Sequence, residues 1–597
     1  MTSERKMPYD IWAENMSRIA ELSHLVAMEW QRIAAKGEGE PSPFAEDFGK
    51  VWEKIWMDAA SRPEEWLRHG MELWCDWMEI ARVSYERALG ADVAFPFSYE
   101  RRDRRFSDEE WSANPFFAGL RHMYLRGCES MREWAYGLCG DDEKMRRRYD
   151  FYVSQYLEAI SPSNFVATNP AAMREFIASH GASLVKGMEN MLGDLRATDR
   201  HFHINLSPPN AFTPGKNIAI SPGDVVYRNY LMEIIRYKPK GPTVAAVPLL
   251  LIPAWINKYY IFDLSEDKSF VRWCVERGFD VYVISWANPD ARMAGVTFDD
   301  YLIDGALAAL DFVRKHSGSK RAALMGYCLG GTLLACLMAY LAKKGRAHEA
   351  LSASFLTTLL DFSDTGDFSV FLDADKVRRI ESQMLRSGGL MDGKAMANIF
   401  SLIRANDLIW NFVVNNYLLG KEPAPFDILH WNADVTNLPA AMHSFYLKNM
   451  YVDNKLMAPN ALSLAGTPMD LGAISVPSYF LAAKEDHIAP WQAVFNGCKL
   501  LLESSVTFVL AGSGHVAGVI NPPAKQKYGY ATSPSEVKTA EEWAAKAVER
   551  AGSWWENWEK WQRELMGEDV RPARENAESL APAPGDYVRR SHAVTSE

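Results

Sequence analysis

The sequence contains little cysteine and no excess of positive charge, and both absences exclude classes of protein. Its 597 residues include seven cysteines, and none of them lies in a C-x-x-C pair. This spacing predicts neither a zinc site nor a disulfide framework, and a reducing cytoplasm is the expected compartment. The formal net charge of -11 argues against nucleic acid as a partner.

Long apolar runs are also scarce. The first residues lead into a helical pattern that carries charges throughout, without the apolar region of a signal peptide. The stretch 322–342 is nearly uncharged and about as long as a membrane span. However, it includes Gly-Tyr-Cys-Leu-Gly-Gly near its start, and such a turn would interrupt a membrane-spanning helix. We therefore expect a buried strand followed by a buried helix, and no transmembrane segment.

The periodicity of apolar residues changes near residue 217. Residues 1–210 are predicted to form a mainly α-helical N-terminal domain, in which Ser61-Arg-Pro-Glu64 resembles a capping box. The tryptophans of this domain are best explained by packing, with a surface for a partner protein or a lipid-like product as the alternative.

Residues 211–597 alternate strands with helices, which predicts a mostly parallel sheet covered on both faces. A helix-rich stretch at 361–455 interrupts the alternation and is predicted to form a cap. The tail from about 567 to 597 is rich in Pro, Ala, Arg and Glu and is expected to be extended. The predicted strands are 244–252, 281–285, 322–325, 353–359, 478–483 and 506–510.

One glycine-rich turn is the most informative feature of the chain. Gly326-Tyr-Cys328-Leu-Gly330-Gly331 stands between an apolar strand and an apolar helix. This is the G-x-S-x-G nucleophile elbow of the α/β-hydrolase fold, with cysteine in the serine position. The turn lifts the sulfur above the sheet and directs the N–H of Leu329 into the same space. A thiol at this position predicts acyl transfer, most simply from a thioester.

A cysteine nucleophile needs a base, and the base needs a carboxylate that orients it. In this fold the acid and the histidine follow later strands, in that order. Asp486 follows the strand 478–483, and His515 follows the strand 506–510. We assign Cys328 as the nucleophile, His515 as general base and later acid, and Asp486 as its partner.

Neighbouring residues leave alternatives open. Glu485 competes with Asp486 for the acid, and His487 competes weakly with His515 for the base. Cys328 taken alone could be a small buried hydrophobic residue, but its place between glycines favours the nucleophile.

The oxyanion hole needs a second donor beside the N–H of Leu329. The loop after the strand 244–252 is expected to supply it, through Trp255, Ile256 or Asn257. We take Asn257 as the candidate among the three.

The whole pattern resembles the polyhydroxyalkanoate synthases, and class I most closely. The elbow, Arg105-Phe-Ser-Asp-Glu-Glu-Trp111 and Glu485-Asp-His-Ile-Ala-Pro-Trp491 carry the resemblance, as do further motifs. Together the matching segments are 105–115, 222–229, 256–264, 285–290, 404–410, 426–434, 485–491, 512–515 and 582–588. They are distributed over the chain from about 105 to 590, whereas the first hundred residues are less distinctive.

The resemblance implies a fold and an activity. It implies an α/β-hydrolase core with a helical cap, preceded by a helical N-terminal domain, and a catalytic set at Cys328, Asp486 and His515. Such enzymes polymerise (R)-3-hydroxyacyl-CoA into polyester with release of CoA, here from short acyl chains such as 3-hydroxybutyryl. They act in the cytoplasm on polyester granules and are homodimers. No cofactor and no metal is expected, because CoA is part of the substrate.

Two rival functions follow from the same residues. An acyl thioesterase or polyester hydrolase would use the same scaffold and would release free acid. A non-catalytic, granule-associated scaffold would bind through its tryptophan-rich helices, but it would leave the three strand-end residues unexplained.

Overall fold

The computed structural model describes residues 7–36, 43–99, 103–198, 202–208, 210–533, 537–573 and 579–590. The chain divides into two compact units. The helical unit comprises Met1–Pro208 and Asn398–Ala424, and the sheet unit comprises Pro209–Ala397 and Pro425–Glu597. The first six residues, on which the expectation about a signal peptide partly rests, lie outside the described residues, as do parts of the tail.

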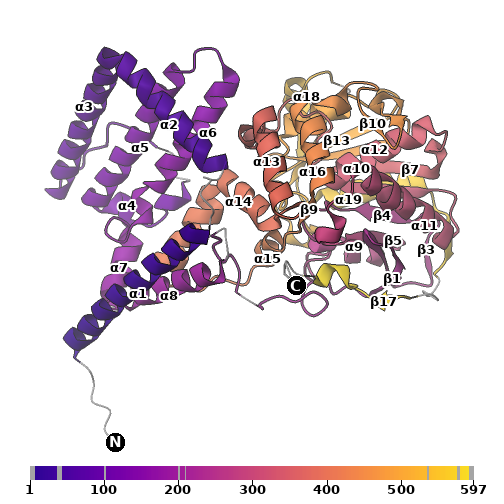
Figure 1. The fold of residues 1–597 in the computed structure, drawn as a ribbon, viewed down its shortest axis with the longest axis horizontal. Helices are drawn as coiled ribbons and strands as arrows, with labels where there is room; N and C mark the ends of the chain where they lie inside the picture. Colours follow the sequence, from indigo (N-terminus) through magenta and orange to yellow (C-terminus); the bar gives the residue numbers. More distant parts are fainter. Residues whose placement is uncertain are drawn as a thin grey trace, which may run out of the picture. The chain divides into compact units, whose positions relative to one another are not determined.

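The helical unit consists of helices, many of which begin at residues that favour a helix start (Figure 1). Five of the described helices begin at a proline, which lacks the N–H that a first helical residue cannot use. The side chains of Asn114 and Asn169 cap two of these helices, and Asp142 caps a further helix that begins at Glu143. The helices are α1 (Pro8–Lys36), α2 (Pro43–Ser61), α3 (Pro63–Ala88), α4 (Glu110–Ala113), α5 (Pro115–Gly137), α6 (Glu143–Ala159), α7 (Pro170–Ala178) and α8 (Ala182–Ala197).

The predicted capping box at the start of α3 is wrong. The N-cap residue is Arg62, which makes no side-chain capping bond, and Pro63 opens the helix. The Ser61 hydroxyl instead donates to the Asp58 carbonyl at the end of α2, at 2.8 Å. Because proline already fixes the first turn, the helix starts one residue later than a serine cap requires.

Buried polar contacts join the helices of this unit. The Trp77 indole of α3 donates to the Met123 carbonyl of α5 at 2.9 Å. On α2, the buried carboxylate of Asp47 accepts from Arg148 and Tyr152 of α6. Such contacts fix helix pairing because an unpaired buried polar group is costly.

Residues 398–424 belong to the helical unit, although they lie within the stretch that we expected to form the cap. The Tyr417 hydroxyl donates to Asp194 of α8 at 2.6 Å, and Gln155 of α6 donates to the Leu402 carbonyl at 3.0 Å. The segment contains the end of α14 (Gly393–Ile403) and two π-helices, η8 (Asn406–Trp410) and η9 (Val413–Leu418).

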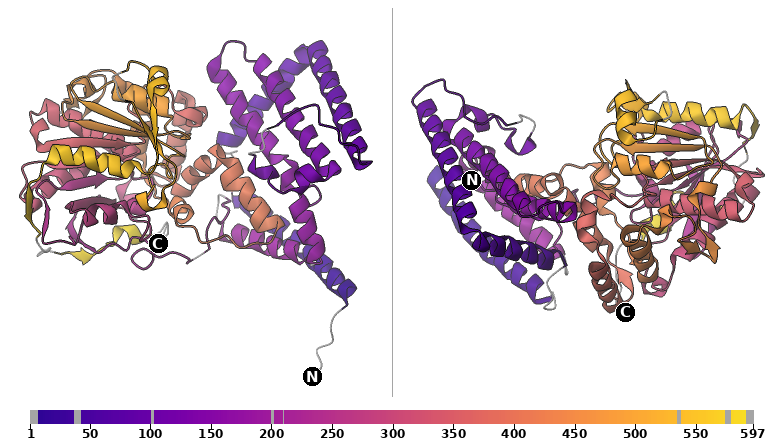
Figure 2. Two further views of the ribbon diagram at one scale, coloured as in Figure 1. Left: turned by 180° about the vertical axis from the view of Figure 1, so that it is seen from behind. Right: turned by 90° about the horizontal axis from the view of Figure 1, so that it is seen from above.

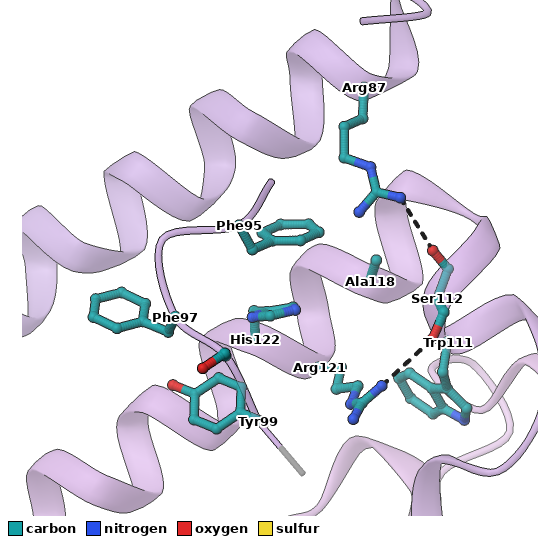
Figure 3. Close-up of a pocket in the computed structure, with 10 residues that line it drawn as sticks. Arg87, Phe95, Phe97, Tyr99, Trp111, Ser112, Ala118, Arg121 and His122 are labelled. Carbon is teal, nitrogen blue, oxygen red and sulfur yellow. Dashed lines mark hydrogen bonds between the residues drawn. The ribbon is translucent and has the colours of Figure 1, made fainter. Parts of the chain in front are cut away.

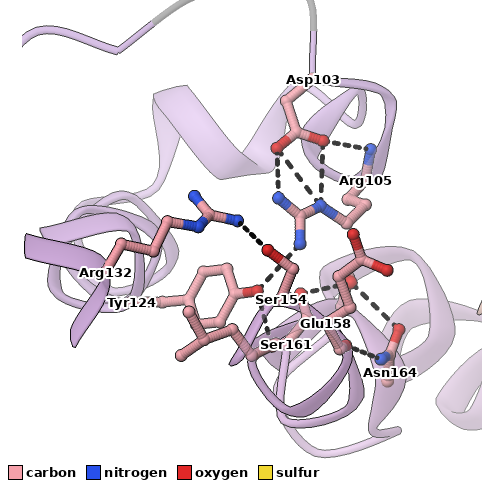
Figure 4. A network of polar contacts seen from close by, with 10 residues as sticks. Asp103, Arg105, Tyr124, Arg132, Ser154, Glu158, Ser161 and Asn164 are labelled. Carbon is pink, nitrogen blue, oxygen red and sulfur yellow. Dashed lines mark hydrogen bonds and ion pairs between the residues drawn. The ribbon is translucent and has the colours of Figure 1, made fainter. Parts of the chain in front are cut away.

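A polar cluster lies inside the helical unit, around the carboxyl group of Glu158 (Figure 4). Arg105 forms an ion pair with Asp103 and donates to the Tyr124 hydroxyl. Among the described residues, Oε2 of Glu158 has no hydrogen-bond partner. Burial raises the pKa of Glu158 to about 7, although the charges of Arg105 and Arg132 oppose the rise.

The sheet unit is organised around one sheet of eleven strands, in the order β15-β14-β13-β12-β7-β6-β4-β5-β2-β1-β17. The six from β13 to β5 are parallel, and antiparallel strands extend both edges. The strands of this sheet are β1 (Gly223–Arg228), β2 (Met232–Tyr237), β4 (Leu249–Ile252), β5 (Val281–Trp286), β6 (Ala322–Tyr327), β7 (Ala350–Leu356), β12 (Ser478–Ala483), β13 (Val506–Ala511), β14 (Tyr530–Thr532), β15 (Val548–Arg550) and β17 (Ala581–Pro582).

Helices cover both faces of this sheet, as predicted for continuously apolar parallel strands. One face carries α9 (Phe270–Glu276) and α19 (Trp554–Met566), the latter drawn in yellow in Figure 2. Their rings meet where Phe270 packs on Trp555, with centroids 5.0 Å apart. The other face carries α11 (Ala308–Ser317) and α12 (Leu329–Lys343) (Figure 1).

The predicted strand 244–252 is two strands. β3 (Thr243–Ala245) pairs with β16 (Val570–Pro572) in a separate two-stranded sheet, whereas β4 enters the large sheet. Pro248 lies between them, and its carbonyl accepts from Ala323 at 2.9 Å. Because proline has no N–H to donate, an uninterrupted ladder cannot run through it.

The described parts of the tail are attached to the sheet unit. β17 adds a strand at the β1 edge, and the buried carboxylate of Glu233 accepts from the backbone N–H groups of Asp586 and Tyr587. The tail is thus extended in part, but it is held in place along the sheet.

The stretch 322–342 forms β6 and most of α12, so the prediction of a buried strand and helix is confirmed. In the described ranges, no helix combines the length and the apolar character that crossing a bilayer requires.

Candidate active site

Cys328 stands at a strained turn between β6 and α12. Its backbone has φ 52° and ψ −121°, a conformation that is rare for a residue with a side chain. The Cys328 N–H donates to the Leu356 carbonyl of β7 at 2.9 Å, which ties the turn to the neighbouring strand. The residue is half-buried, in contrast to the fully buried Cys336 of α12. This is the geometry that the elbow motif predicts.

The glycines of the motif are required by close backbone approaches. A Cβ on Gly326 would lie 2.5 Å from the Cα of Gly331, and a Cβ on Gly330 would lie 2.6 Å from the Pro253 carbonyl oxygen. Atoms cannot approach so closely, and backbone atoms cannot swing aside. Only glycine lets α12 begin directly above the strand end and beside the loop after β4.

The loops that follow β12 and β13 lie next to each other because these strands are parallel neighbours. The N–H of Glu485 donates to the Ser513 carbonyl at 2.8 Å. Across this junction, Nδ1 of His515 lies 2.7 Å from Oδ2 of Asp486. The other carboxylate oxygen accepts from the backbone N–H groups of Ile488 and Ala489, at 2.8 and 2.9 Å. Asp486 is therefore fixed in position on both oxygens.

His515 lies against the elbow, with its ring centroid 5.4 Å from that of Tyr327. Burial lowers the pKa of His515, but the charge of Asp486 and the sulfur of Cys328 outweigh it and hold the pKa well above its usual value. An imidazole so placed can accept the thiol proton and remain protonated beside the thiolate. That pair is the activated state of a nucleophilic cysteine.

The two competing residues differ from Asp486 in their exposure to solvent. Glu485 and His487 are exposed, whereas the side chain of Asp486 is completely buried. The geometry thus brings Asp486, and neither neighbour, to His515.

The loop predicted to complete the oxyanion hole contacts the cap. Thr436 donates to the carbonyls of Trp255 and Ile256, and the Asn257 side chain donates to the Trp431 carbonyl at 3.5 Å. The N–H of Leu329 begins α12, where the helix dipole favours negative charge. Asn257 as the second donor stays a prediction.

Two tyrosines of the cap that sequence reasoning missed lie close enough to Cys328 for its charge to affect them. Tyr446 ends α16 (Ala440–Tyr446), and Tyr451 lies in the π-helix η10 (Leu447–Val452). Burial raises the pKa of both phenols, and negative charge at Cys328 raises it further. Both therefore stay neutral hydrogen-bond donors. No pattern in the sequence marks them, because their proximity depends on how the cap folds back.

A cavity of about 300 Å³ lies in the helical unit and is lined by aromatic and basic side chains (Figure 3). Arg87 donates to the Ser112 carbonyl at 3.3 Å, and Phe95 stacks on His122 with centroids 4.0 Å apart. Burial and two arginines lower the pKa of His122 to about 4. Because these groups already contact one another, we assign the cavity no ligand.

Comparison with protein families finds two matches. Residues 102–274 match the model described as the poly-beta-hydroxybutyrate polymerase (PhaC) N-terminus. Residues 247–522 match the model of the alpha/beta hydrolase fold, and this range contains all three candidate catalytic residues.

Similar proteins extend over nearly the whole chain. The poly(3-hydroxyalkanoate) polymerase of Methylorubrum extorquens is 46% identical, covering 99% of this chain and 100% of its own. The poly(3-hydroxyalkanoate) polymerase subunit PhaC of Rhizobium meliloti is 41% identical, covering 97% and 94%. The corresponding subunit of Cupriavidus necator is 42% identical, covering 82% and 83%.

Proposed function

Because this chain belongs to the poly(3-hydroxyalkanoate) polymerase family and is therefore an acyltransferase, we propose that it builds its polyester on the sulfur of Cys328. The observation that carries this proposal is the placement of that sulfur at a positive-φ elbow beside a histidine held by a buried carboxylate. The proposed substrate is a short-chain (R)-3-hydroxyacyl-CoA.

The first half-reaction is acylation of the cysteine. His515 takes the thiol proton, and the thiolate attacks the carbonyl carbon of the acyl-CoA. The oxyanion is held by the N–H of Leu329 and by a second donor, for which Asn257 is the candidate; one such donor is worth about 3 to 4 kcal/mol. The carbon–sulfur bond to CoA breaks, and the leaving thiolate receives the proton from His515. Acyl-Cys328 remains.

The second half-reaction forms the ester. The 3-hydroxyl of another acyl unit attacks the acyl-Cys328 carbonyl and gives its proton to a base. Both oxygens of Asp486 are occupied, by His515 and by two backbone N–H groups. This supports His515 as the base and Asp486 as the residue that orients it. The thiolate leaves and is ready for the next unit.

The cap supplies large side chains around the nucleophile. Tyr446 packs on Trp255, with ring centroids 5.9 Å apart, and on Tyr451 at 5.9 Å. Bulky rings of this kind would restrict the room for an acyl side chain, in line with the proposed preference for short chains. They also exclude water, which would otherwise hydrolyse the acyl-enzyme. Association with the granule surface and a homodimeric state belong to the same proposal.

The proposal is tested by supplying (R)-3-hydroxybutyryl-CoA to the purified full-length chain. We expect CoA release together with an insoluble polymer, and neither from Cys328→Ala. Cys75→Ser, which removes an exposed thiol elsewhere, should behave like the parent. Free 3-hydroxybutyrate without polymer would instead identify a thioesterase. Equal polymer from Cys328→Ala would remove Cys328 from the mechanism.

A further inference from the structure

Lys258 is a buried lysine at the end of the loop that is predicted to complete the oxyanion hole. Only 4% of its surface is exposed. A lysine is rarely buried to this extent unless its ammonium group is paired. Here Nζ donates to the backbone carbonyl of Arg590 at 2.8 Å. The proposed reaction steps do not involve this contact, although it joins two segments that are 332 residues apart in the sequence.

The same loop is fixed at its other end by the elbow. Residues 253–258 form this loop, which we call the oxyanion loop. A Cβ on Gly330 would lie 2.6 Å from the Pro253 carbonyl oxygen, so the backbones of the elbow and the loop are in direct contact. The Trp286 indole also donates to this carbonyl, at 2.9 Å. The candidates for the second oxyanion donor lie between the anchors at Pro253 and Lys258. They are Trp255, Ile256 and Asn257.

The cap holds the backbone of the oxyanion loop. The indole of Trp431, in α15 (Asp427–Ala433), donates to the Lys258 carbonyl at 2.7 Å. The N–H of Thr436 donates to the Ile256 carbonyl at 3.0 Å. These contacts tie the loop backbone to the cap, whereas the side chain of Lys258 ties it to a different segment.

That segment, residues 586–590, is itself anchored to the large sheet; we call it the C-terminal segment. The N–H groups of Asp586 and Tyr587 donate to the buried carboxylate of Glu233 in β2, each at 3.1 Å. The guanidinium of Arg590 lies over the Tyr587 ring, 4.5 Å from its centroid. The Arg590 carbonyl is therefore an acceptor whose position is set by the sheet.

An unpaired ammonium group would be costly at the position of Lys258. Burial lowers the pKa of Lys258, and the charge of Asp434 in the cap opposes the fall. Asp434 already accepts from the Tyr260 hydroxyl at 2.8 Å. If the Arg590 carbonyl moved away, the ammonium would lose its acceptor and would have to turn towards water, which would displace the end of the loop.

We propose that Lys258 is a positioning residue for acylation, through which the C-terminal segment holds the oxyanion loop in place. This inference rests on the proposed acyl transfer at Cys328. A donor in the loop must lie within hydrogen-bond distance of an oxygen that carries its charge only in the transition state. A displaced loop therefore lowers kcat, but it leaves KM and the nucleophilicity of Cys328 unchanged.

The first test is Lys258→Met, which keeps much of the side chain and removes the ammonium group. We expect kcat for CoA release from (R)-3-hydroxybutyryl-CoA to fall about 10- to 100-fold with KM unchanged, because a small misplacement in an active site has effects of this size. Alkylation of Cys328 by iodoacetamide needs no oxyanion hole and should proceed at the parent rate, followed on its peptide by mass spectrometry. Lys499→Met is the matched control, since its ammonium also donates to a distant backbone carbonyl, that of Val537 at 2.6 Å. It should change neither rate.

The second test is Tyr587→Ala, which loosens the C-terminal segment without altering the oxyanion loop. It removes a buried ring and the hydrogen bond from its hydroxyl to the Asn229 carbonyl at 2.5 Å. We expect kcat to fall with KM and Cys328 alkylation unchanged, as in Lys258→Met. If Lys258 acts through this segment, the double variant should be no slower than Lys258→Met alone.

Three results would overturn the inference. The first is an unchanged kcat in Lys258→Met. The second is an equal loss of CoA release and of Cys328 alkylation, which would assign Lys258 a role in the fold alone. The third is a double variant in which the two losses multiply, which would separate Lys258 from the C-terminal segment. Failure of the proposed function is recognised separately, by polymer formation in Cys328→Ala.

Discussion

Asp486 determines how the proton is shared at the candidate active site. Its charge and hydrogen bond oppose the effect of burial and hold the pKa of His515 above its usual value. The carboxylate thus favours the protonated form of the imidazole, which would stabilise a thiolate formed beside it. Substitution by asparagine keeps the shape and removes the charge.

We expect Asp486→Asn to lower the rate of CoA release by about 10²- to 10⁴-fold. Without the carboxylate the pKa of His515 falls, so the imidazolium is lost at lower pH and stabilises the thiolate less. The pH profile of Cys328 alkylation by iodoacetamide should then move to higher pH. Glu485→Gln, at the exposed neighbour, is the control and should leave both measurements unchanged; an unshifted profile in Asp486→Asn would remove the carboxylate from this role.

For single residues, the sequence located the candidate catalytic segments, but it did not show which side chain of each segment reaches the site. It placed Cys328 and His515 by their motifs, but it left Glu485, Asp486 and His487 as competitors because all three follow the same strand. What separates them is the turn after β12, in which two backbone N–H groups bind Asp486. Tyr446 and Tyr451 could not be predicted, since their position depends on the fold of the cap.

Close backbone contacts within the elbow between β6 and α12 hold Cys328 in its position. A side chain on Gly326 would meet the backbone of Gly331 at 2.5 Å, so Gly326→Ala must displace the start of α12. We expect a loss of about 1 to 3 kcal/mol in the free energy of unfolding and a large loss of polymerisation.

Denaturant unfolding and CoA release measure the two effects of this substitution. Gly295→Ala is the matched control, because a Cβ there meets nothing within 4 Å. If Gly326→Ala polymerised like the parent, the backbone approach would not be needed for the chemistry.

Helix α6 buries a carboxyl group that titrates near neutrality. The ordinary pKa of 4.5 applies to Glu158 in the unfolded chain, whereas the folded chain holds the proton until about pH 7. Between these values the folded state binds more protons, so stability falls as pH rises, by at most about 3 kcal/mol. The loss is complete once the pH exceeds the folded pKa.

Glu158→Gln should flatten this dependence. The charged groups that face Glu158 are Arg105, Arg132, Asp103 and Asp407, and all of them remain in the variant. Unfolding of parent and variant between pH 5 and 8 measures the difference, with Glu175→Gln at an exposed site of α7 as the control. A parent stability that rises through this interval relative to the variant would contradict the assignment.

Strands with a strong apolar pattern were predicted well, whereas a break within such a strand was not. The strands 478–483 and 506–510 were located almost to the residue because they are continuously apolar. The strand 244–252 was not, since Pro248 divides it and β3 pairs with a distant part of the tail. Long-range pairing of this kind has no local signal.

The chain combines a candidate active site in the sheet unit with a helical unit. The order of motifs predicted the α/β-hydrolase core, its mostly parallel sheet and the preceding helices. It did not predict that residues 398–424 pack with α6 and α8, because their amphipathic pattern does not specify which helices they contact.

The central claim, that the growing polyester is carried by Cys328, is tested most directly by mass spectrometry of the enzyme quenched during turnover. After incubation with (R)-3-hydroxybutyryl-CoA, the peptide that contains Cys328 should carry one or more 3-hydroxybutyryl units in a bond that hydroxylamine cleaves. An adduct on a different residue, or polymer formation with no adduct at Cys328, would contradict the account.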